Sequence, residues 1–169
     1  MRRVVAFAAA LVLVIGLVPA VAARQPGTTS PVSGTWTWVN TGAVWTDLPD
    51  GSQQVVGDEA GTWTGSFQGT SRDAFVMTFQ PPLWTSPEDT EWGSAKGSLT
   101  AYFDGVAGDK NGTMIMEITI FEEANSWVMT GTWTIVAGKG ALKHVSGSGS
   151  WLCDGMASSA TYWGSITWK

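Results

Sequence analysis

Apolar and polar residues alternate along most of this chain from Gly34 onwards, with the period of two that places successive side chains on opposite faces of a β-strand. In Thr35-Trp36-Thr37-Trp38 the two tryptophans share one face and the two threonines share the other. Threonine and aromatic residues suit a pleated, half-buried surface, and no stretch keeps a helical period without interruption by glycine. The alternation recurs in residues 62–67, 72–79, 127–136 and 161–168. The pattern predicts an all-β fold.

Turn-forming residues separate the alternating segments. Asp109-Lys110-Asn111-Gly112 is a strong hairpin signal, because Asn and Gly accept the positive φ of a type I′ turn. Pro81 to Trp92 is too rich in proline and acidic residues for a central strand, so we expect a long loop there. A single closed antiparallel β-barrel of about eight strands over residues 34–169, with an aromatic interior, accounts for the spacing and leaves no edge strand. Further turns are expected at Asp50-Gly51, Asp104-Gly105 and Asp154-Gly155.

The first residues have the features of an export signal. Met1-Arg2-Arg3 is a short basic segment, Val4 to Val18 is apolar, and Ala20-Val21-Ala22 supplies the small residues that signal peptidase reads. We therefore expect residues 1–22 to be a signal peptide and residues 23–33 to be a polar linker. The alternative is an uncleaved anchor, since Val4 to Ala23 is long enough to span a bilayer. Cleavage would deliver a secreted or periplasmic protein that is not stably inserted in a membrane.

Charge and cysteine content exclude several kinds of function. Nine Lys and Arg stand against fourteen Asp and Glu, a formal net charge of −5, so nucleic acid is not an expected partner. Cys153 has no second cysteine with which to form a disulfide inside the chain. We expect it to be buried as a small apolar residue, with a dimer cross-link or a reactive thiol as alternatives. One His and one Cys cannot build a closed zinc site, and no metal or cofactor is predicted.

The C-terminal half resembles a known group of barrels. It contains a Gly-rich hairpin from Gly105 to Gly112, followed by Val136-Ala137-Gly138-Lys139-Gly140, Gly147-Ser148-Gly149 and Tyr162-Trp163-Gly164. This order of elements resembles the allene oxide cyclase-like β-barrel superfamily, which includes the dirigent proteins, and is most similar to an uncharacterised bacterial branch of it. The resemblance implies homo-oligomers, because related barrels pair or trimerise through their outer strands. None of the superfamily's catalytic residues can be matched to a position here, so no catalytic residue is assigned.

The eleven tryptophans are the most unusual feature of the composition. Most are expected to fill the barrel core, since each buries about 150–250 Å². Those on inward faces would also form a stacking wall for a flat ligand at the barrel mouth. The candidate ligand-binding residues are Trp36, Trp38, Trp63, Trp133 and Trp151. Tryptophans expected in loops or on the opposite face, and therefore exposed, are Trp45, Trp84, Trp92 and Trp163.

The titratable side chains do not form a recognisable catalytic set. Glu117 lies on the face opposite to Met114, so we expect it to face solvent; with the register inverted it would be a buried carboxyl and a general-acid candidate. The acidic residues in 88–91 and at 122–123 fall in a loop and at a strand end, where we expect them to be solvated. His144 follows Lys143 in an expected turn and is predicted to be exposed and inert.

Three functions are consistent with these features. Non-catalytic binding of a small hydrophobic or aromatic ligand is favoured, because the sequence offers no acid–base or nucleophile set. An isomerase or cyclase that uses the barrel cavity is the first alternative, and a buried titratable group on the inward face would support it. An extracellular carbohydrate-binding module is the second, and loop tryptophans that form a flat exposed platform would support it.

Overall fold

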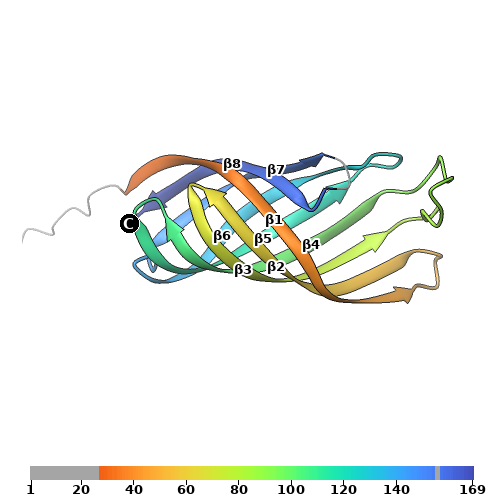
Figure 1. Ribbon diagram of the computed structural model, residues 1–169, viewed down its shortest axis with the longest axis horizontal. Helices are drawn as coiled ribbons and strands as arrows, with labels where there is room; N and C mark the ends of the chain where they lie inside the picture. Colours follow the sequence, from red (N-terminus) through yellow and green to blue (C-terminus); the bar gives the residue numbers. More distant parts are fainter. Residues whose placement is uncertain (1–26, 155–156) are drawn as a thin grey trace, which may run out of the picture.

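The computed structural model describes residues 27–154 and 157–169, so the expected signal peptide at residues 1–22 lies outside the described residues. Each strand pairs antiparallel with its neighbours in the sequence, and the last pairs with the first, so the sheet closes into a barrel (Figure 1). The prediction of a closed all-β barrel is confirmed. The eight strands are β1 (Thr28–Asp47), β2 (Gln53–Gly65), β3 (Phe67–Phe79), β4 (Ala95–Ala107), β5 (Lys110–Glu122), β6 (Val128–Gly140), β7 (Val145–Asp154) and β8 (Ser159–Trp168). Within the described ranges there is no helix long and apolar enough to cross a membrane.

The first strand begins earlier than expected. Residues 28–33, which we expected to belong to the linker, pair with the end of β8, from Thr28 opposite Trp168 to Ser33 opposite Trp163. The reason is geometric, because a barrel closes only when its last strand finds a partner. The Thr, Ser and Pro residues of this segment are typical of a spacer when they are considered locally. Their pairing depends on a strand at the other end of the chain.

The alternation along each strand separates an apolar interior from a polar exterior, as predicted. Trp36, Trp63 and Trp133 are almost completely buried, whereas Thr37 between the two β1 tryptophans is exposed. Glu117 is also exposed, on the outer face of β5, which confirms the register assumed for that strand. The inward faces together form one continuous hydrophobic core.

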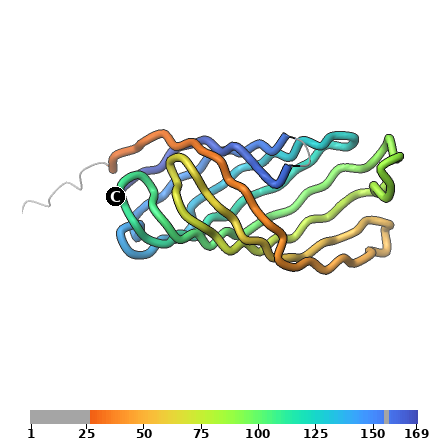
Figure 2. The backbone as a smooth tube through the Cα atoms, in the orientation of Figure 1, coloured from red at the N-terminus to blue at the C-terminus, as the bar shows by residue number. Residues whose placement is uncertain are grey.

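The strand connections gather at two opposite ends of the barrel (Figure 2). The β2–β3, β4–β5 and β6–β7 turns lie at the end where the C-terminus is found. The β1–β2 and β3–β4 connections project from the other end, and the long loop predicted at 81–92 is part of the β3–β4 connection at 80–94. Asp50-Gly51 forms the expected turn after β1, and Gly51 has a φ of 84°.

Two predicted turns are wrong in position. The β4–β5 hairpin turns at Gly108-Asp109, whereas Asn111-Gly112 already belongs to β5. Gly108 has a φ of 63°, so it supplies the positive φ that was expected at Asn111 and Gly112. Asp104-Gly105 lies inside β4, because the pairing of β4 with β5 continues beyond it as far as Ala107. The expected turn at Asp154-Gly155 falls partly outside the described residues.

Aromatic side chains fill the barrel at the end near the C-terminus. Phe67 and Tyr162 stack with their ring centres 5.2 Å apart, and Trp133 meets Phe67 edge-on at 5.7 Å. The Tyr162 hydroxyl donates a hydrogen bond to the carbonyl of Thr64 and accepts one from the amide of Phe67, both at 2.9 Å. All three rings are fully buried. This end of the barrel is therefore a packed core with satisfied polar groups.

Cys153 is fully buried on β7, as expected for a small apolar residue. Its thiol donates a hydrogen bond to the carbonyl of Ala157 at 3.1 Å, and burial raises its pKa. We expect Ellman's reagent to modify Cys153 at least roughly tenfold more slowly in the folded protein than in urea, because access and thiolate formation are both suppressed. Absorbance at 412 nm reports the two rates. Equal rates would restore the alternative of a reactive thiol.

Candidate functional site

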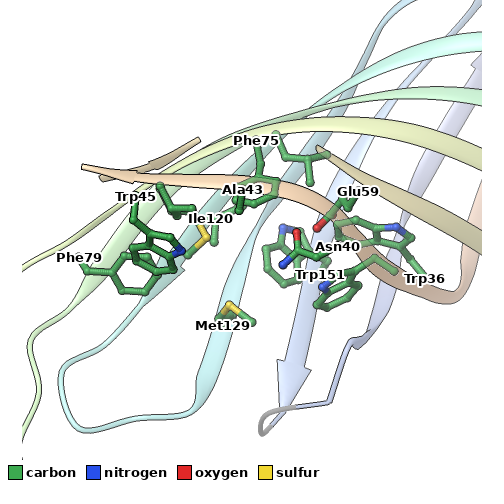
Figure 3. Close-up of a pocket in the computed structure, with 14 residues that line it drawn as sticks. Trp36, Asn40, Ala43, Trp45, Glu59, Phe75, Phe79, Ile120, Met129 and Trp151 are labelled. Atoms are coloured by element: carbon green, nitrogen blue, oxygen red, sulfur yellow. The ribbon is translucent and has the colours of Figure 1, made fainter. Parts of the chain in front are cut away.

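The barrel end opposite the packed core contains a cavity of about 190 Å³ (Figure 3). Its outer part lies between the end of β1, at Trp45, and the end of β3, at Phe79. Most of the lining is aromatic or aliphatic, and the polar side chains in it are Asn40 and Glu59. Pockets that hold drug-sized ligands have about 300–1,000 Å³. This cavity therefore suits a small ligand.

Three of the five candidate tryptophans meet in this cavity. The ring centres of Trp36 and Trp38 are 4.7 Å apart, and those of Trp36 and Trp151 are 6.1 Å apart. The planes of Trp36 and Trp151 form an angle of 83°, so these two indoles make a corner rather than a parallel slot. Trp63 stacks on Trp36 at 5.2 Å but does not line the cavity, and Trp133 lies in the packed core. Of the five predicted ligand-binding tryptophans, three therefore line the cavity and two belong to the core.

Two buried carboxyl groups adjoin this corner. Glu59 of β2 lines the cavity with only 7% of its surface exposed. Asp73 of β3 is 2% exposed and is the residue directly opposite Glu59 in the β2–β3 ladder. Figure 3 shows Glu59 and Asn40 at the same end of the cavity as Trp36 and Trp151. The inner end of the cavity therefore combines indole faces with acidic groups.

The alternation of β2 and β3 contains a signal for both carboxyls. Glu59 shares its face with Trp63, and Asp73 shares its face with Phe75 and Met77. An acidic residue on the apolar face of a strand is unusual, because a buried charge needs a partner or must be protonated. Glu117, the candidate expected only if the register of its strand were inverted, lies on a solvent-facing surface.

Gly61 makes room for the polar groups around Asp73. A Cβ atom at this position would lie 2.7 Å from Trp36 Nε1 and 2.8 Å from Asp73 Oδ2, and would also collide with Ser71 Oγ. Ser71 Oγ accepts a hydrogen bond from Trp63 Nε1 at 2.9 Å. Neither oxygen of Asp73 nor Trp36 Nε1 has a hydrogen-bond partner of ordinary geometry within the described part of the chain. The polar groups next to the inner end of the cavity are thus close together but not joined by hydrogen bonds of ordinary geometry.

Burial changes the acidity of both carboxyls. Burial, followed by the nearby charge of Asp73, raises the pKa of Glu59 from 4.5 to about 8. Burial also raises the pKa of Asp73 from 3.8 to about 6, against the opposing influence of the Ser71 hydroxyl and the Trp36 indole N–H. At pH 7 the pair therefore carries about one negative charge, and Glu59 is mainly protonated.

A second hollow lies at the mouth of the barrel, where aromatic residues of the loops meet. Trp92 and Trp127 have ring centres 4.4 Å apart, and Trp84 meets Trp127 at 89°. These rings do not form the flat platform that would support the carbohydrate-binding alternative. Glu122, which we expected to be solvated, lines this hollow and is only 8% exposed, because the inward face of β5 continues to its last residue. Burial raises the pKa of its carboxyl.

Most other candidate residues lie where the sequence placed them. Trp45, Trp84 and Trp163 are exposed as expected, whereas Trp92 is half-buried. His144 is exposed in the turn at 141–144. In residues 27–154 and 157–169, the His, Cys, Asp and Glu side chains do not form a group of three that could hold a metal ion. The buried carboxyls of Glu59 and Asp73 are therefore the main chemical feature of the interior.

Comparison with known proteins adds information about the fold. No family model matches the sequence, and no curated protein matches it. A protein of unknown function from the DUF3224 family of Shewanella oneidensis MR-1 aligns with a TM-score of 0.64 and 14% identity, over 84% of this chain and 98% of that protein. A pterocarpan synthase dirigent protein aligns with a TM-score of 0.44 and 17% identity, over 89% of this chain and 94% of that protein. The first match supports the barrel fold, and membership of the allene oxide cyclase-like superfamily stays a prediction.

Proposed function

We propose that this protein is a binding barrel that holds a small hydrophobic or aromatic ligand in the cavity at its open end, without converting it. The observation that carries the proposal is the contrast between the two ends of the barrel. One end is filled by stacked aromatic rings, whereas the other is lined by similar residues around a cavity of about 190 Å³. In this proposal residues 1–22 direct export, so that the ligand is met outside the cytoplasm.

The tryptophans of the cavity wall are held by contacts within the barrel. Trp36 packs against Trp63, at 5.2 Å, and against Trp38, at 4.7 Å. Trp151 is fixed by a hydrogen bond from its Nε1 to the carbonyl of Thr119 at 2.9 Å. A wall that is already ordered loses little conformational entropy on binding, which favours affinity for a small ligand.

Tryptophan fluorescence of the purified protein tests the proposal. We expect a panel of small aromatic and alicyclic compounds to include ligands that change the emission with saturation. Replacing Trp38 by alanine should weaken their affinity about tenfold, since Trp38 is half-buried in the wall and its loss removes roughly 1.4 kcal/mol of contact. Trp163→Ala is the matched control, because Trp163 is exposed on the outer face of β8. Equal losses in the two variants, or no saturable binding at all, would contradict the proposal.

An isomerase or cyclase reaction in the same cavity is a second candidate, favoured by one observation. Glu59 lines the cavity, and its pKa is raised to about 8. It is therefore mainly protonated at neutral pH, as a general acid must be. The two candidates differ in what is recovered after incubation with a ligand. An unchanged compound supports binding alone, whereas an isomer of the same mass that forms only when Glu59 is present supports catalysis.

A further inference from the structure

The inner end of the cavity joins aromatic faces to buried acid. We propose that the ligand carries a compact positive charge with apolar substituents, such as a tertiary or quaternary ammonium group, and that this group occupies the corner between Trp36, Trp38 and Trp151 beside Glu59. The inference rests on the proposed function and specifies the chemical class of the ligand.

The shape of the wall favours a rounded group over a flat one. The planes of Trp36 and Trp151 stand at 83° and those of Trp36 and Trp38 at 38°, so these cavity-lining pairs offer no parallel slot in which a flat ring would be sandwiched. Trp36, Trp38 and Trp151 all line this part of the cavity. Indole rings attract a cation through their negative π-faces, and tryptophan gives the strongest effect of this kind. An alkylated ammonium group also buries its methyl groups against such a wall.

The charge of the cavity favours the same class. Glu59 is the acidic residue in its lining, and Asp73 lies directly opposite Glu59 in the β2–β3 ladder. None of the described residues that line the cavity is Lys, Arg or His. The described part of the chain carries fourteen acidic and six basic side chains, so its field also draws cations toward the opening. A carboxylate ligand would meet repulsion and would find no partner of opposite charge in the lining.

The unsatisfied groups at this position support the proposal independently of the net charge. Asp73 is 98% buried next to Glu59 and does not itself line the cavity. The Ser71 hydroxyl and the Trp36 indole N–H lie close enough to lower its pKa, but neither Asp73 oxygen nor Trp36 Nε1 has a hydrogen bond of ordinary geometry in the described residues. Two carboxyl groups side by side in an apolar interior are destabilising when both are ionised. A cation seated beside Glu59 would supply the missing opposite charge and let both carboxyls ionise.

Binding of such a cation should therefore release a proton from Glu59 to solvent. Asp73 on β3 is the charged group whose field acts on Glu59. The residues that β1 and β7 present to the cavity beside it are Trp36, Trp38, Asn40 and Trp151, none of which titrates, while Glu122 of β5 lies at the mouth. The affinity for a permanent cation is expected to rise roughly tenfold between pH 6.5 and 8.5, because ionised Glu59 becomes available over that range.

Choline and its uncharged carbon isostere 3,3-dimethylbutan-1-ol form a matched pair of probes for isothermal titration calorimetry. We expect choline to bind about tenfold more tightly at pH 8, and the anion 3,3-dimethylbutanoate more weakly than either. Glu59→Gln should reduce the affinity for choline about tenfold and that for the neutral alcohol less than twofold. Glu117→Gln, on the exposed face of β5, removes the same charge without touching the cavity and should change neither affinity.

The outcomes show separately whether the inference about the ligand's charge fails and whether the proposed function fails. Binding of the neutral alcohol that equals or exceeds that of choline, or choline binding that is insensitive to Glu59→Gln and to pH, overturns the inference and leaves the proposed function intact. If neither these probes nor the aromatic panel bind, both proposals fail. Unchanged binding of the neutral alcohol by Glu59→Gln shows that the variant is folded around its cavity.

Discussion

Replacing Trp133 by alanine is expected to lower the free energy of unfolding by about 3–5 kcal/mol, the largest effect of any single substitution considered for this barrel. Trp133 is 1% exposed, meets Phe67 edge-on, and donates a hydrogen bond from Nε1 to the carbonyl of Trp163. Its ring also packs on the backbone of Gly149 and Gly164, where an added Cβ would lie 2.7 and 2.6 Å from ring atoms. Removing it leaves a cavity that this rigid surrounding cannot collapse to fill.

Urea unfolding followed by circular dichroism measures this loss. Trp163→Ala serves as the control, because its side chain is 46% exposed on the outside of β8 and its carbonyl remains in place. The control should change the unfolding free energy by less than about 1 kcal/mol. A loss of similar size in both variants would mean that the end near the C-terminus is not a tightly packed core.

Glu59→Gln is expected to remove most of the dependence of stability on pH between 6.5 and 8.5. The pKa of Glu59 is raised from 4.5 to about 8 in the folded chain, so the folded state holds the proton more tightly than the unfolded state. The stabilisation is complete below about pH 4.5 and is lost as the pH rises through 8. For the natural protein we expect a fall of about 1–2 kcal/mol over this range, allowing for the solvent that reaches the cavity.

Urea unfolding at intervals of half a pH unit measures both slopes. The pKa of Asp73 is about 6, so its contribution to the pH dependence of stability falls mainly below pH 6.5. A change in stability that the glutamine side chain causes equally at every pH does not alter the slope of the unfolding free energy against pH. Glu117→Gln should retain the slope of the natural protein, because Glu117 lies on the outer face. A slope that persists in Glu59→Gln would mean that another group titrates, and that the Glu59 carboxyl is not buried as described.

The alternation of residues was sufficient to place Trp36, Trp63 and Trp133 inside the barrel and Glu117 outside it. This succeeds because the period of two is a local property of each strand, and one buried face repeats it along the whole strand. The hairpin at 108–109 shows the limit of local signals. Asn111-Gly112 has the composition of a turn, but the pairing of β4 with β5 extends through it.

Contacts between distant strands were not available from the sequence. Which tryptophans line a cavity and which fill the core depends on how far each strand is staggered around the barrel. Trp36 and Trp151 come from β1 and β7 and meet only in the folded barrel. Glu59 and Asp73 face each other through the β2–β3 register. An acidic residue on the otherwise apolar face of a strand indicated each of these two buried carboxyls locally. The same pattern would indicate buried carboxyls in similar barrels.

The central claim is that the open end of the barrel is the binding site and the aromatic end is a core. Nuclear magnetic resonance of the indole N–H groups in ¹⁵N-labelled protein tests it most directly, because each tryptophan gives its own signal. On titration with a compound that saturates, the signals of Trp36, Trp38 and Trp151 should move most, while those of Trp133 and the exposed Trp163 stay in place. Movement confined to Trp84, Trp92 and Trp127, or no movement at the three cavity tryptophans, would contradict the claim.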